Sequence, residues 1–351
     1  MKIQGIGKYT AVLGVSAMLV SGCGLFGPEQ DVSIDPPPLS QVEVETPQAV
    51  PGEESGEVEE PEAMTGTYER TVYLLDANGY VVPVSLTLPK EEGTAKQVLT
   101  YMVKGGPVEA MLPNGFSAVF PEGTKVQGLV IKEGVATIDF SKEFKTYKQE
   151  DEKKILDAIT RAMTEFDNVK TVQIWINGTP LTEMPVARTP INELDRTLGV
   201  NLELADGAVP GKTTAVTVYF QSQLDNARTY FVPVTRLIPE TDNVAKATVE
   251  ELIKGPKEGT QLFSSLLRTT RVLDVQQQND LITVNLSDDI LKYDEGREAS
   301  PDVLESLVLS LTESTGAKQV QLLVEGKPIS GGAQDFSKPV ARPLLVNSLS
   351  F

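Results

Sequence analysis

The sequence predicts an α+β protein that consists of two tandem copies of one small domain. The first observation is residues 245–256, where apolar side chains recur with the period of a helix and a Gly-Pro pair ends the pattern. The second is residues 95–107, which carry the same pattern about 150 positions earlier and also end in glycine and proline. The third is that the segments on either side match as well. Matches in one order indicate an internal duplication.

The flanking matches include proline, glycine and arginine positions that a preference for β-strand residues alone would not explain. The offset between the copies varies from 146 to 154 residues, which indicates short differences in loop length. The matched pairs are Thr71-Val-Tyr73 with Thr217-Val-Tyr219, Val82-Pro-Val84 with Val232-Pro-Val234, residues 135–141 with 281–287, residues 172–181 with 320–329, and Pro185-Val-Ala-Arg188 with Pro339-Val-Ala-Arg342.

The first copy is expected to occupy residues 67–198. Asn78-Gly79 is a strong hairpin signal between two alternating strands, and Pro83 inside the second strand favours a sheet edge or a bulge. The expected elements are strands at 71–75 and 81–88, a helix at 95–104, a hairpin of strands 126–131 and 135–140, a helix at 151–166 and a strand at 171–176.

The second copy is expected to occupy residues 213–351 in the same ββαββαβ order. Ser300 and Pro301 are typical of a helix start, with serine as N-cap and proline in the first turn. This order predicts a small antiparallel or mixed sheet with two helices on one face. The expected elements are strands at 215–221 and 229–236, a helix at 243–254, a hairpin at 271–276 and 281–286, a helix at 301–314 and a strand at 319–324.

The N-terminus has the three parts of a secretory signal. Residues 1–22 contain two lysines, an apolar run too short to span a bilayer, and small residues before Cys23. The sequence Leu19-Val-Ser-Gly-Cys23 resembles a bacterial lipobox, in which the cysteine is acylated, for example with palmitate. We therefore predict lipidation at Cys23, which is the sole cysteine of the chain. The alternative is an incidental cysteine after an ordinary signal peptide.

Residues 28–66 have the composition of a disordered spacer. They hold seven prolines and eleven carboxylates, with no lysine, arginine or aromatic residue. Low hydrophobicity and charge of one sign oppose folding and extend the chain. The segment either holds the folded part at a distance from a membrane or is a linker whose length matters little.

The composition argues against most enzyme chemistry. The 351 residues contain no histidine and one cysteine, and the net charge of −18 without basic blocks argues against nucleic-acid binding. The stretch 207–213 resembles a P-loop but is one residue short and lacks the first glycine. Asp288 and Asp289 do not have EF-hand spacing. We therefore expect no catalytic, cofactor-binding or metal-binding residue, no cofactor and no enzymatic activity.

The lipobox at Cys23, the acidic spacer and two Thr-Val-Tyr … Lys-Gly-Pro … Gly-x-Pro units together resemble the GerMN domain family. The similarity covers about residues 71–343 and the lipoprotein leader. The resemblance implies a ring-building type of α/β domain, with helices packed on one face of a small sheet. The family supplies no catalytic residues, so Cys23 is the one functional residue that the resemblance assigns.

The resemblance also implies a role. It predicts a membrane-anchored structural lipoprotein of sporulation and germination that assembles as a homo-oligomeric ring in a channel-like complex between mother cell and forespore. Its partners would be the bilayer, through acylated Cys23, and other ring or channel proteins. It would lie on the outer face of the mother-cell membrane, in the intermembrane space. The alternative is a lipoprotein module that binds cell-wall glycan or spore cortex.

Overall fold

The computed structural model describes residues 66–351, except 192–193, 225–227, 293–298, 330–335 and 349–351. The signal peptide, Cys23 and the acidic spacer lie outside the described residues, so their predictions stay predictions. Both repeats belong to one compact unit of the chain. Among the described residues no helix is long and apolar enough to span a membrane.

The first repeat contains a long hairpin and a separate mixed sheet. Strands β1 and β2 form a two-stranded sheet, whereas the separate sheet has the order β3-β4-β5-β6 with β4 and β5 parallel. The two-residue turn Glu133-Gly134 joins β3 and β4, and both of its φ angles are positive. The elements are β1 (Thr67–Leu75), β2 (Val81–Pro89), α1 (Thr94–Thr100), β3 (Val126–Lys132), β4 (Val135–Phe140), α2 (Glu152–Met163), β5 (Thr171–Ile176) and β6 (Thr179–Pro180).

The second repeat has the same arrangement with small additions. Strand β7 (Glu203–Leu204) pairs with β9, and β14 (Val340–Ala341) pairs with β12, which is again parallel to β11. The tandem α+β fold is therefore confirmed, and its sheets are mixed. The other elements are β8 (Thr213–Leu224), β9 (Arg228–Pro239), α3 (Val244–Lys254), β10 (Val272–Gln278), β11 (Leu281–Leu286), α4 (Pro301–Thr315), β12 (Gln319–Val324) and β13 (Lys327–Pro328).

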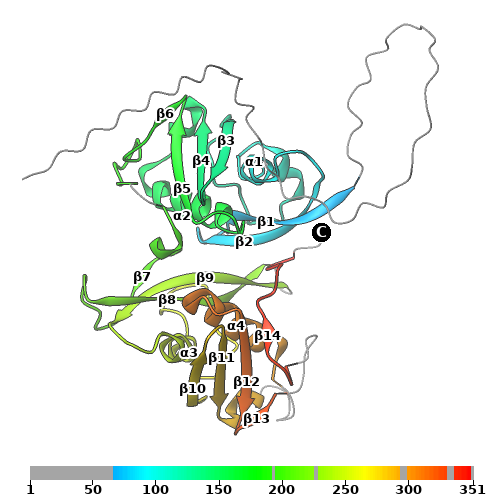
Figure 1. Cartoon of the computed structure of the whole chain (residues 1–351), viewed down its shortest axis with the longest axis vertical. Coiled ribbons are helices and arrows are strands. Elements are labelled where there is room, and N and C mark those ends of the chain that lie inside the picture. The colour runs from blue at the N-terminus through cyan, green and yellow to red at the C-terminus, as the bar shows by residue number, and fades with distance from the viewer. Residues whose placement is uncertain (1–65, 192–193, 225–227, 293–298, 330–335, 349–351) are drawn as a thin grey trace, which may run out of the picture. The chain divides into compact units, whose positions relative to one another are not determined.

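In each repeat the helices lie between the hairpin and the mixed sheet. Helix α2 contacts β1 and β5, and α4 contacts β8 and β12. Their inward side chains, such as Ile159 and Leu307, are fully buried. Figure 1 shows that the hairpins β1–β2 and β8–β9 meet between the two halves, and β2 contacts β9. The hairpins thus form the surfaces through which the repeats meet.

The first helix is shorter than predicted. It ends at Thr100, because the following residues turn away to contact another segment. The backbone N–H groups of Val119 and Phe120 donate to the carbonyl of Met102, and Lys104 N–H donates to Phe120. Tertiary pairing thus replaces the last helical turn that the residue pattern predicted.

The other helix ends are close to the predictions. Helix α3 begins after Asn243, whose side chain accepts a hydrogen bond from the Lys246 N–H, and it ends at Gly255 with a φ of 80°. Helix α4 begins with Pro301, but Ser300 caps it through its backbone carbonyl and makes no side-chain cap. Helix α2 begins one residue later and ends three residues earlier than expected.

Candidate functional site: the interface between the two repeats

Strands β2 and β9 approach each other with a proline on each facing edge. Pro83 and Pro233 have no N–H group, so these edges cannot form a complete ladder. Two asparagines supply the missing hydrogen bonds. Each comes from the segment that follows one repeat, and each has a left-handed backbone, with φ of 49° at Asn201 and 54° at Asn347.

The two asparagines make reciprocal contacts. The Asn201 carboxamide donates to the Val81 and Pro233 carbonyls at 2.8 and 2.7 Å and accepts from the Val81 N–H at 2.8 Å. The Asn347 carboxamide donates to the Pro83 and Phe231 carbonyls at 2.8 Å and accepts from the Phe231 N–H at 2.7 Å. Each side chain therefore joins the two repeats with three hydrogen bonds.

The residues before the asparagines are exchanged between repeats. Val200, at the end of repeat one, bonds through its N–H and carbonyl to Thr235 of repeat two. Val346, at the end of repeat two, bonds in the same way to Ser85 of repeat one. Since each repeat holds the tail of the other, the interface is reciprocal and resembles that of a symmetric dimer.

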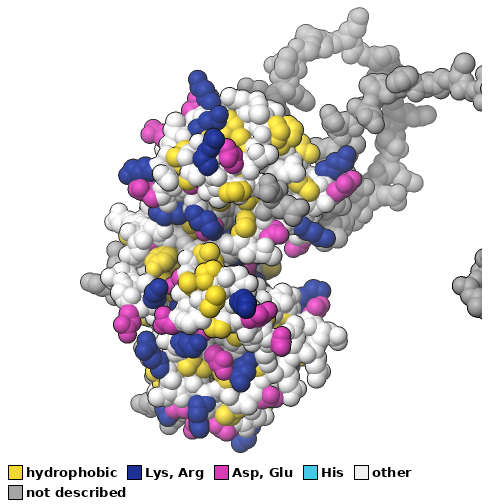
Figure 2. All heavy atoms as spheres, turned by 90° about the vertical axis from the view of Figure 1, so that its left-hand side faces the viewer, with side chains coloured by type: hydrophobic (Ala, Val, Ile, Leu, Met, Phe, Trp, Pro, Cys, Tyr) yellow, Lys and Arg dark blue, Asp and Glu magenta, His cyan; other side chains and the backbone are white. Residues whose placement is uncertain are grey.

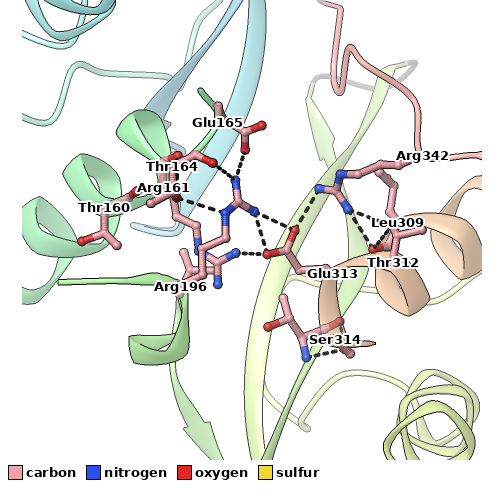
Figure 3. Close-up of polar contacts among 12 residues, drawn as sticks. Thr160, Arg161, Thr164, Glu165, Arg196, Leu309, Thr312, Glu313, Ser314 and Arg342 are labelled. Carbon is pink, nitrogen blue, oxygen red and sulfur yellow. Dashed lines mark hydrogen bonds and ion pairs between the residues drawn. The ribbon is translucent and has the colours of Figure 1, made fainter. Parts of the chain in front are cut away.

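A buried carboxylate lies at the centre of the same interface. Glu313 of α4 is 5 % exposed at its side chain and pairs with three arginines. Arg161 of α2 is in direct contact with it, while Arg196 and Arg342 lie at 2.8 and 3.0 Å. Figure 3 shows the three guanidinium groups converging on this carboxylate, two from repeat one and one from repeat two.

Burial alone would raise the pKa of Glu313, but the charges of Arg161, Arg196 and Arg342 outweigh it and hold the pKa well below its usual range. The carboxylate is therefore ionised at neutral pH. Its removal would leave buried guanidinium groups without their partner, which is strongly unfavourable. Glu313 is thus the residue on which the charge balance of the interface depends.

Repeat one contains a related but more exposed cluster. Tyr73 donates to Glu165 at 2.6 Å, and Arg196 pairs with Glu165 at 2.7 Å. In repeat two, Arg342 donates to the Tyr219 hydroxyl at 2.7 Å and pairs with Glu313. Burial raises the pKa of both tyrosines, so both hydroxyls stay protonated. The matched Tyr73 and Tyr219 are therefore buried interface residues.

The structure corrects the sequence match of the two tails. Arg188 has a side chain that is 73 % exposed and pairs with Glu183, so it is not the counterpart of Arg342. The counterpart is Arg196, because Leu194 bridges to Val172 just as Val340 pairs with Val320. The offset is then a constant 146 over the tails, and both read Arg-x-Leu-x-Val-Asn, at residues 196–201 and 342–347. This hexapeptide is the signal that the sequence comparison missed.

A further polar contact between the repeats joins Asp76 to Tyr230. Asp76 accepts hydrogen bonds from the N–H groups of Asn78 and Tyr80 within its own turn. It also accepts a hydrogen bond from the Tyr230 hydroxyl at 2.9 Å, and Phe116 packs edge-on against the Tyr230 ring. Burial raises the pKa of Tyr230, which keeps it a donor.

The remaining candidates from the sequence do not form a chemical site among the described residues. Asp289 pairs with Lys292 and accepts from Ser287, in a 3₁₀ turn, and Asp288 lies beside it. The Ser141 hydroxyl accepts a hydrogen bond from the Lys125 N–H, and the Ser287 hydroxyl accepts the matched one from the Arg271 N–H. Within the described part of the chain no group of three His, Cys, Asp or Glu side chains is arranged to hold a metal ion.

These features define a protein of two like domains held together as one unit. Comparisons with known proteins identify the family of these domains. Residues 71–182 and 217–330 each match the Germane family model, described as sporulation and spore germination. The chain belongs to this family, with two copies of its domain.

The similar proteins agree over nearly the whole chain. The spore germination protein GerM of Bacillus subtilis (strain 168) is 38 % identical over 365 residues, which cover 98 % of this chain and 99 % of that protein. The solved structure of the tandem GerMN domains of the sporulation protein GerM from Bacillus subtilis is 40 % identical. It covers 81 % of this chain and all of that one, with a TM-score of 0.76.

Proposed function

We propose that this protein is a membrane-anchored structural lipoprotein of sporulation and spore germination, and not an enzyme. The proposal rests mainly on the reciprocal interface. There the matched arginine and asparagine residues of both repeats form hydrogen bonds and ion pairs that hold the repeats together. The family and its relatives, whose names refer to sporulation and germination, support the cellular role. Among the described residues, no group of three His, Cys, Asp or Glu side chains is arranged to hold a metal ion.

The proposal includes an anchor and an assembly. Acylated Cys23 would hold the protein on the outer face of the mother-cell membrane, and several acyl chains would make that attachment stable. The two-domain unit would then join other copies, and partner ring or channel proteins, in the complex between mother cell and forespore. Two like domains, each with a sheet edge that pairs with no other strand among the described residues, suit repeated protein–protein contacts.

The test is complementation in sporulating cells that lack the native protein. The full chain is expected to restore spore formation and to fractionate with membranes. Cys23→Ser is expected to be released from the membrane and to lower the spore yield, with Ser21→Ala as a matched control in the same segment. Normal localisation and yield of the Cys23→Ser variant would contradict the anchor. A full chain that stays monomeric and captures no envelope protein by cross-linking would contradict the assembly.

The glycan-binding alternative predicts exposed aromatic platforms. The matched Tyr73 and Tyr219, which are the obvious candidates, are 2 % and 1 % exposed and lie in the interface. Binding of the intact protein to purified peptidoglycan in a sedimentation assay would nevertheless favour that alternative over the structural role.

A further inference from the structure

Each mixed sheet ends in a strand whose outer edge is unpaired in the described part of the chain. In repeat one this strand is β3, and in repeat two it is β10. Both belong to hairpins with two-residue turns and both carry a bulge near their start, at matched positions 146 residues apart. An unpaired edge strand presents N–H and C=O groups that another strand can bond.

The pairing register identifies the outward-facing groups. In an antiparallel hairpin, alternate residues bond across the ladder and those between them point their backbone groups outward. The residues that close the turns are Lys132 with Val135, and Gln278 with Leu281. Counting back from these pairs, Leu129 and Ile131 face outward on β3, and Val275 and Gln277 face outward on β10.

The two edges also share an open surface. Val130 on β3 is 63 % exposed and Leu273 on β10 is 43 % exposed, so each edge strand presents an apolar side chain to solvent. An open hollow of about 330 Å³ lies beside β10. Its lining includes Val275 and Gln277, whose backbone groups point outward, together with residues 242–245 at the start of α3. The edge of β10 is therefore accessible from the side.

The charges on the two edges are complementary. Strand β3 (Val126–Lys132) carries one charged side chain, Lys132, for a net charge of +1. Strand β10 (Val272–Gln278) carries one charged side chain, Asp274, for a net charge of −1. Like edges would repel each other, whereas β3 and β10 attract, so the charges favour a contact between unlike edges.

We propose that β3 of one copy pairs antiparallel with β10 of a second copy, an inference that rests on the proposed assembly function and supplies its contact. In the register with the greatest overlap, Leu129 lies opposite Gln277 and Ile131 opposite Val275, so all four outward-facing residues form hydrogen-bonded pairs. The same register places Lys132 directly opposite Asp274, both exposed and neither in an ion pair within the described residues.

This contact joins unlike surfaces and leaves one free edge at each end of the pair. It therefore repeats from copy to copy, and it closes into a ring or continues as a filament, depending on the rotation between copies. Because the interface between the two repeats uses β2 and β9, the edges of β3 and β10 remain available. Each copy thus contributes a basic edge to one neighbour and an acidic edge to the other.

Disulfide cross-linking tests the register. In the proposed pairing Val130 and Gln276 form a non-hydrogen-bonded pair, whose Cα atoms lie about 4.5 Å apart, within the range that a disulfide spans. The experiment uses residues 66–351, which correspond to the tandem domains that fold in the solved relative. The fragment has no native cysteine. It is tethered to vesicles through an N-terminal histidine tag and nickel-chelating lipid, then oxidised.

The double variant Val130→Cys/Gln276→Cys is expected to form a ladder of covalent multimers. The matched control Thr179→Cys/Lys327→Cys, on the exposed short strands β6 and β13 at the opposite side of the sheets, is expected to give at least tenfold less product. Rapid dimers of the single Val130→Cys variant would overturn the proposal in favour of a like-edge contact. No ladder, while lysine cross-linking still gives multimers, would overturn this contact and leave the proposed function standing. No multimers by either method would contradict both.

Discussion

The two repeats have one fold but carry unequal parts of their shared interface. In repeat two the buried carboxylate Glu313 contacts three arginines, whereas the matched Glu165 of repeat one is 32 % exposed and contacts one. Part of the difference arises at one matched position, where repeat one has Arg161 and repeat two has the fully buried Leu309. The rest arises because Arg196 pairs with Glu313 as well as with Glu165. Two duplicated domains can thus keep reciprocal backbone contacts while only one of them provides the buried carboxylate.

Neutralising the two matched carboxylates is expected to give the largest difference between the repeats. Glu313→Gln is expected to lower the free energy of unfolding by about 3–5 kcal/mol, because it leaves buried arginines without a counter-charge. Glu165→Gln is expected to cost less than about 1 kcal/mol, since that pair is partly exposed to solvent. Urea unfolding of residues 66–351 measures both. Equal losses in the free energy of unfolding would mean that the buried arginines do not depend on Glu313 for their counter-charge.

Removing the reciprocal asparagines tests the symmetric part of the comparison. Asn201→Ala and Asn347→Ala are each expected to cost about 2–4 kcal/mol, because each leaves interface backbone groups without partners. The costs should be similar, since the contacts are equivalent. Asn177→Ala is a matched control with a comparable positive φ at an exposed turn, and it is expected to cost about 1 kcal/mol or less. A cost at either interface position no larger than that of the control would contradict the reciprocal joint.

The pH dependence of the free energy of unfolding tests whether the pKa of Glu313 is lowered. Its pKa in the folded protein is lowered from the usual 4.5, so its contribution is fully present above that value and is lost as the pH falls toward the folded pKa. The stability difference between the native protein and Glu313→Gln should be constant from about pH 7 to pH 5 and should shrink below about pH 4.5. A difference that already shrinks near neutral pH would indicate a raised pKa instead.

The smallest effect is expected from making the repeats more alike. Arg161→Leu introduces into repeat one the residue of repeat two, and Arg196 and Arg342 still neutralise Glu313. Replacing part of a buried ionic cluster by an apolar residue is often close to neutral, so the change should stay within about 1 kcal/mol. Arg196→Leu should be clearly worse, because Arg196 also bonds Glu165 and Thr164. The reverse order would mean that Arg161 is the essential partner.

The sequence predicts the repeated elements because their signals are local. Asn78-Gly79 and Gly255-Pro256 act through their own backbone geometry, and strand alternation follows from burial on one face. These signals gave the order of the elements and all four strands of the two short hairpins within one or two residues. The lipidation of Cys23 remains a prediction from such a local pattern.

The interface escaped the sequence comparison because it depends on contacts between distant segments. Asn201 and Asn347 lie in irregular tails, where no periodicity marks them. The identical tetrapeptides ending at Arg188 and Arg342 suggested that these two arginines are equivalent. Strand pairing shows instead that Arg196 is the equivalent of Arg342. The predicted end of helix α1 was wrong for a related reason. Hydrogen bonds between residues 102–104 and Phe120 replace the last predicted helical turn.

The two repeats are expected to unfold as one unit, because their interface joins them. Differential scanning calorimetry of residues 66–351 tests it most directly, by comparing the calorimetric with the van't Hoff enthalpy. We predict one transition with a ratio near 1 for the native protein, and two separable transitions after Asn201→Ala, Asn347→Ala and Glu313→Gln are combined. Two independent transitions in the native protein would contradict the account.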